Sequence, residues 1–145
     1  MSVPKALPLA RAPRTAIAFS LAPWAAGTIA FSLVLQAYVA LTRQINWDEF
    51  YFLSRIYDYR RGDLNSVLQT FYVHLFAWLP LIPLGTIGQI VVARLAMLAL
   101  ETGTLGLIYY SARRFVSRDA ALLGVLSYAT FGYVLIHGAS FRADP

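Results

Sequence analysis

Cysteine is absent from this chain, and charged side chains are scarce. Without cysteine, disulfides and thiolate metal sites are excluded. Only 13% of the residues are charged and 59% are hydrophobic, whereas about a quarter of the residues in a soluble domain are charged. The chain also lacks a glycine-rich phosphate loop, a serine nucleophile elbow and a metalloprotease helix. The composition therefore predicts an integral membrane protein, and none of these catalytic motifs assigns it an activity.

The net charge of +5 is distributed as in a membrane protein rather than as in a nucleic-acid-binding groove. One cluster of cations precedes the first apolar run and a second lies between two later runs: Lys5, Arg11 and Arg14, then Arg113, Arg114 and Arg118. Positive charge concentrates in the cytoplasmic loops of membrane proteins. We therefore expect both clusters in the cytoplasm, and we expect no nucleic acid among the partners.

The apolar runs divide the chain into a cytoplasmic tail, residues 1–14, and a single membrane domain, residues 15–145. A helix that spans a bilayer core needs about 20 mostly apolar residues. Three segments meet this requirement, and we predict spans over residues 15–41, 87–110 and 120–139. With a cytoplasmic N-terminus, three crossings place the C-terminus on the outer side.

The stretch between the first two spans, residues 43–83, is predicted to lie at the outer surface. Asn46 and Glu49 have the spacing of a capping pair for a helix that begins near Trp47. The mixture of aromatic and charged residues on this helix is typical of a helix that lies along a membrane surface. Helical periodicity assigns its apolar face to Phe50, Leu53 and Tyr57.

Residues 64–83 are apolar but contain His74, Pro80 and Pro83. If this segment crossed the membrane, the second cluster of arginines would lie outside, against the positive-inside rule. We therefore predict a re-entrant or interfacial segment here. The resulting fold class is an all-α integral membrane protein, with three transmembrane helices plus one or two interfacial or re-entrant helices on the outer face.

Two short charged motifs follow apolar segments and are expected on the same outer face. In the first, Asp48 or Glu49 would accept a proton from an acceptor hydroxyl or amine, or Asp48 would hold a divalent cation beside a phosphate. In the second, Arg142 would contact an anionic substrate group, with Asp144 beside it. Helix capping and ordinary polar helix ends are the alternative interpretations.

Two ionisable residues lie within the second predicted span. Arg94 and Glu101 are seven residues apart, so they share one helix face and form a polar pair within the membrane. Arg94 lies near the outer end, where its side chain would snorkel to the surface. Glu101 lies close to mid-membrane, where we expect it to be protonated or bonded to a neighbouring helix. Its helix face would be covered by residues 15–41 or by a partner chain.

Arg55 and His74 are further candidate substrate-binding residues in the surface segment. For His74 a hydrogen-bonded or interfacial position is the simpler interpretation, and a phosphate or metal contact is the alternative. The only other histidine, His137, is predicted on a different helix, so the sequence shows no pair of histidines for a metal site.

The order of these elements resembles the N-terminal part of the C-type fold of integral-membrane glycosyltransferases. A signal-anchor helix precedes Asp48-Glu49, a later span ends in Tyr-Tyr-Ser-Ala-Arg-Arg, and the final motif reads His-Gly-Ala-Ser-Phe-Arg-Ala-Asp. The bacterial aminoarabinose transferases and the protein O-mannosyltransferase group share this pattern, which covers residues 15–144 here.

This resemblance implies transfer of a sugar from a polyprenyl-phosphate donor at the periplasmic face of a bacterial inner membrane. Asp48 would be the catalytic base or a metal-linked carboxylate, Glu49 would support it, and Asp144 would belong to the second acidic motif. Family enzymes usually carry many more spanning helices, so a module that is incomplete on its own is expected. The alternative is a small non-catalytic membrane subunit that packs against other membrane protein subunits.

Overall fold

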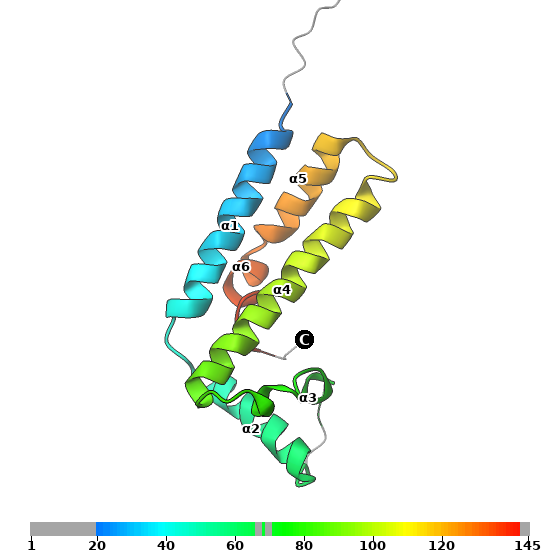
Figure 1. Ribbon diagram of the computed structural model, residues 1–145. Coiled ribbons are helices and arrows are strands. Elements are labelled where there is room, and N and C mark those ends of the chain that lie inside the picture. Colours follow the sequence, from blue (N-terminus) through cyan, green and yellow to red (C-terminus); the bar gives the residue numbers. More distant parts are fainter. Residues whose placement is uncertain (1–19, 66–67, 69–70, 143–145) are drawn as a thin grey trace, which may run out of the picture.

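A computed structural model describes residues 20–65, 68 and 71–142 (Figure 1). The tail predicted over residues 1–14 and the candidate residue Asp144 lie outside the described residues. The described part of the chain is helical and contains no strand, which confirms the all-α prediction. Its elements are α1 (Ala22–Thr42), α2 (Trp47–Arg61), α3 (Tyr72–Leu75), the 3-10 turn η1 (Leu79–Leu81), α4 (Thr86–Ala112), α5 (Arg118–Ala129) and α6 (Gly132–His137).

Two of these helices are long and apolar enough to cross a membrane, namely α1 and α4. They have 21 and 27 residues, and at about 1.5 Å per residue each reaches the roughly 30 Å of a bilayer core. They coincide with the first two predicted spans.

The third predicted span, residues 120–139, is not confirmed, because this stretch forms two shorter helices. The 12 residues of α5 extend about 18 Å, well short of a bilayer core. The break falls at Thr130 and Phe131, where the Thr130 hydroxyl donates to the Leu126 carbonyl at 2.8 Å and Phe131 is extended. Back-bonding by threonine and the following Gly132 both weaken a helix at this point.

Helices α1, α4 and α5 pack side by side, with α1 and α5 parallel and α4 antiparallel to both (Figure 1). At one end the Asp119 carboxylate accepts from the Leu21 amide at 3.0 Å, so the start of α5 lies against the start of α1. The opposite end holds α2, α3, η1 and the C-terminal segment, residues 138–142. The two charged motifs therefore share one end, as the sequence predicts.

The capping pair predicted for α2 is present, since the Asn46 side chain accepts from the Glu49 amide and Glu49 accepts from the Asn46 amide. The helix ends at Gly62, whose φ of 76° requires glycine. The predicted apolar face is wrong in part. The buried residues of α2 are Glu49, Phe52, Leu53 and Ile56. Periodicity alone misplaced the face, because Glu49 is buried by an ion pair and rotates the buried stripe toward Phe52.

Residues 64–83 contain no helix of spanning length among their described positions, in agreement with the predicted re-entrant or interfacial segment. The short α3 and η1 instead fold onto α2 and the start of α4 around an aromatic cluster. The rings of Phe52 and Phe76 contact Phe141 edge-on, with centroids 6.3 and 5.1 Å apart. This cluster attaches the C-terminal segment to the helices that precede it.

We expect Phe141→Ala to lower the free energy of unfolding by about 3–5 kcal/mol, because it removes a fully buried ring from the aromatic cluster. Thermal unfolding in micelles checks this, with Phe115→Ala as the matched control because Phe115 is exposed in the α4–α5 turn. Equal stability losses in the two variants would contradict the packing described here.

Candidate functional site

A buried ion pair joins α2 to α4 at the end of the helix bundle that also holds α3 and η1. Arg94 donates from Nε to Glu49 Oε1 at 2.8 Å and from Nη2 to Glu49 Oε2 at 2.6 Å, in the bidentate geometry favoured by guanidinium and carboxylate. The two side chains are only 3% and 1% exposed. Arg94 therefore does not snorkel to the surface, as the sequence suggested, but turns inward to meet α2.

The remaining guanidinium donors of Arg94 cap the C-terminal end of α1. Nη1 donates to the carbonyls of Ala40 and Arg43 at 3.1 and 2.8 Å, and Nη2 donates to Gln44 at 3.1 Å. Carbonyls at a helix C-terminus lack partners within the helix and carry partial negative charge, so a cation is favourable there. All five N–H groups of Arg94 are thus used within the chain.

The Glu49 carboxylate is equally saturated, since each oxygen accepts two hydrogen bonds. Besides Arg94, Oε1 accepts from the Phe141 amide at 3.1 Å and Oε2 from the Asn46 amide at 3.2 Å. Burial acts to raise the pKa of Glu49, but the bonds from Arg94 and the two amides outweigh it, and the pKa lies below the ordinary 4.5. With these partners Glu49 anchors α2 to α4 and to the C-terminal segment.

Asp48 and Arg142 form the accessible counterpart of this buried pair. They are 94 residues apart in the chain, yet Arg142 Nη2 donates to Asp48 Oδ2. Their side chains are 42% and 31% exposed, so solvent reaches both. The neighbouring residue Glu49 accepts from the Phe141 amide. Two adjacent residues of α2 therefore bind two adjacent residues of the C-terminal segment.

The other predicted site residues are not gathered here. Arg55 pairs with Asp58 at 3.3 Å and stacks on the Tyr51 ring, and His74 Nδ1 lies 2.8 Å from the Tyr59 hydroxyl. Tyr59 is eleven residues beyond Asp48, about 16 Å farther along α2. Both candidates thus have local partners in the surface segment. The predicted polar pair is also separated, since Arg94 bonds Glu49 and Glu101 accepts from Gln36 of α1 at 3.1 Å.

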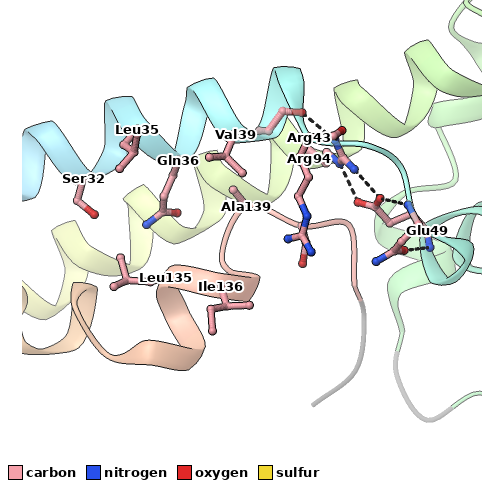
Figure 2. A pocket seen from close by; sticks show the side chains of 13 residues that line it. Ser32, Leu35, Gln36, Val39, Arg43, Glu49, Arg94, Leu135, Ile136 and Ala139 are labelled. Carbon is pink, nitrogen blue, oxygen red and sulfur yellow. Dashed lines mark hydrogen bonds and ion pairs between the residues drawn. The ribbon is translucent and has the colours of Figure 1, made fainter.

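A cavity of about 220 Å³ lies between α1 and α6, and Figure 2 shows its lining. Its walls are apolar, with Leu35 and Val39 on one side and Leu135 and Ile136 on the other, and the Arg94–Glu49 pair closes one end. Further polar groups at its lining are Arg43, Asn46 and Gln36. Sequence reasoning missed Arg43 and Gln36. For Gln36 the sequence did offer a signal, since its amide side chain lies within an apolar run that contains no charged residue.

Within the described parts of the chain, no three histidine, aspartate or glutamate side chains are arranged to hold a metal ion. Asp48 has Arg142 as its neighbour, and a cation in contact with its carboxylate opposes a divalent ion there. The divalent cation considered from the sequence therefore stays a prediction.

Comparison of the chain with protein-family models, curated proteins and solved structures found no match.

Replacing one partner of the buried pair should cost about 3–5 kcal/mol of stability, because the other charge stays buried without it. We expect Glu49→Leu and Arg94→Met each to have this effect, and the double variant to lose clearly less than their sum. The matched control is the exposed pair Asp58 and Arg61, changed in the same way, for which the coupling should stay below about 1 kcal/mol. Additive losses at the buried pair would contradict its role.

The lowered pKa of Glu49 predicts a loss of stability in acid. The unfolded chain takes up the proton near the ordinary 4.5, whereas the folded chain resists protonation. The contribution is therefore complete above that pH and declines as the pH falls from 4.5 toward the lowered folded pKa. Unfolding curves between neutral pH and pH ~3 should show this decline, and Glu49→Gln should flatten it. An identical pH profile in that variant would refute the assignment.

Proposed function

We propose that this chain is a glycosyltransferase-like membrane module that acts on a polyprenyl-phosphate sugar at its outer end. The observation that carries the proposal is the Asp48–Arg142 ion pair, in which two motifs 94 residues apart in the chain meet at a solvent-accessible position. In this proposal α1 and α4 cross the bacterial inner membrane, residues 120–139 complete a third passage, and the ion pair faces the periplasm.

The cavity between α1 and α6 suits the lipid part of such a donor. Its apolar walls fit the prenyl units, and Arg43 lies near its polar end, where a phosphate would be favourable. Its volume of about 220 Å³ is below the ~300–1,000 Å³ of typical small-molecule sites, so only the units next to the phosphate would fit. The rest of the prenyl chain would lie in the bilayer.

The chemistry assigned to Asp48 is general-base catalysis. Its carboxylate takes the proton from an acceptor hydroxyl or amine, the acceptor atom forms a bond to the anomeric carbon, and the polyprenyl phosphate leaves with the electron pair of the broken C–O bond. Arg142 holds the Asp48 carboxylate in place before the reaction and stabilises the negative charge on the departing phosphate. Glu49 and Arg94 position this pair without contacting the substrate.

Asp48→Asn should lower sugar transfer by about 100-fold or more, because an amide cannot accept the proton. The measurement is transfer from a radiolabelled polyprenyl-phosphate sugar in membrane vesicles that contain the protein. Asp58→Asn is the matched control, since Asp58 is an ion-paired carboxylate on the same helix but away from Arg142.

Unchanged transfer by Asp48→Asn would rule out this mechanism. No transfer by the unmodified protein, with the chain inserted and folded, would favour the alternative function of a non-catalytic subunit of a larger membrane complex. The exposed apolar side chains of α1, including Trp24, Phe31 and Tyr38, would then offer a surface to other subunits.

A further inference from the structure

A second cavity, of about 280 Å³, lies between α4 and α6; it is distinct from the α1–α6 cavity assigned to the donor, although Arg142 of the proposed catalytic pair is among its lining residues. Its walls combine apolar side chains with a carboxylate, an imidazole and a phenol ring, contributed by Met97, Leu100, Glu101, Tyr133, Val134 and His137. Glu101 is the sixteenth residue of the 27 in α4, and this places it near the middle of the helix. The proposed transfer reaction does not use it.

The Glu101 carboxylate is only half satisfied. It is 9% exposed, and its Oε1 accepts from Gln36 Nε2 at 3.1 Å. Oε2 has no hydrogen-bond donor among the described residues, and the same holds for the Gln36 carbonyl oxygen as an acceptor. Buried acceptors are nearly always paired, and an unpaired one is costly. The unpaired Oε2 of Glu101, a residue that lines the cavity, therefore indicates a place for a molecule that brings an N–H or O–H donor.

Gly138 leaves the space that this carboxylate occupies. A Cβ atom at position 138 would lie 2.2 Å from Glu101 Oε2, so any other residue would collide with it. Gly138 also lines the cavity, directly after α6. The unpartnered oxygen thus packs against the backbone at the end of α6, in the wall of the cavity.

The groups that surround the Glu101 carboxylate include no cation that pairs with it in the described parts of the chain. On α1 the neighbour is the neutral amide of Gln36. On α6 it is His137, whose ring packs against Tyr133 with centroids 4.6 Å apart. In the C-terminal segment Arg142 lines the cavity but is ion-paired with Asp48. Among the described residues no ion pair reaches Glu101.

We propose that this cavity binds a small apolar amine, whose ammonium group donates to Glu101 Oε2. An ammonium supplies a donor for Oε2 together with a positive charge opposite the carboxyl group, and the aromatic rings of Tyr128 and Tyr133 attract cations. Met97, Leu100 and Val134 pack against its hydrocarbon part. A multivalent metal ion is a poorer fit, since the described residues bring no second carboxylate or histidine cluster to this wall.

Met97 provides a direct observation of binding, because it lines the cavity and the chain has only one other methionine, Met1. The protein labelled with ¹³C at the methionine methyl groups is placed in phosphatidylcholine nanodiscs and titrated with n-octylamine. The neutral n-octanol, of equal chain length, is the control ligand. We expect a saturable shift of the Met97 signal with the amine, and a clearly weaker response to the alcohol.

Glu101→Gln should weaken octylamine binding about tenfold or more, as expected for loss of a charge-assisted hydrogen bond, and should leave the octanol response unchanged. Val134→Phe, which fills the cavity and keeps Glu101, should also abolish the shift. If circular dichroism shows that Glu101→Gln does not fold, Val134→Phe tests the binding proposal on its own. Equal amine affinity in a folded Glu101→Gln, full binding by Val134→Phe, or octanol binding as tight as that of the amine would each overturn the proposal.

Discussion

One end of this structure, where α2 meets α1 and α4, depends on the bidentate ion pair between Arg94 and Glu49. Four segments meet at these two side chains: the end of α1, the start of α2, the body of α4 and the backbone of Phe141. Removing two charges from water carries a large desolvation free energy. This penalty is offset only when the hydrogen-bonding capacity of both groups is used. Here all five guanidinium donors and both carboxylate oxygens have partners. The pair is therefore neutral overall, and none of its hydrogen-bonding groups lacks a partner.

The accessible chemistry of the molecule follows from that buried anchor. Asp48 and Arg142 meet because their neighbours, Glu49 and Phe141, are already held together by a hydrogen bond. The exposed pair on its own would be weak, since ion pairs in contact with solvent contribute little. A rigid structural pair beneath an accessible one is an arrangement that keeps reactive groups in register without using them for stability.

Local rules predicted much of this fold from the sequence. The two long apolar runs, the capping box at Asn46 and the meeting of the two charged motifs at one end all follow from hydropathy, spacing and charge bias. The break at Thr130 was missed because an apolar run of sufficient length does not report a backbone kink. The partner of Arg94 was missed because helical spacing predicts contacts within α4, whereas its true partner comes from α2, 45 residues away.

The ends of α1 also bear on how the chain assembles during synthesis. The amide of Leu21 is satisfied by Asp119, 98 residues later in the chain. The Ala40 carbonyl at the other end of the helix accepts a hydrogen bond from Arg94, which is made 54 residues later. At roughly 5–20 residues per second, about 5 to 20 seconds pass between the making of Leu21 and of Asp119. The first helix is thus made with the backbone groups at both ends unpaired, and segments synthesised later supply their partners.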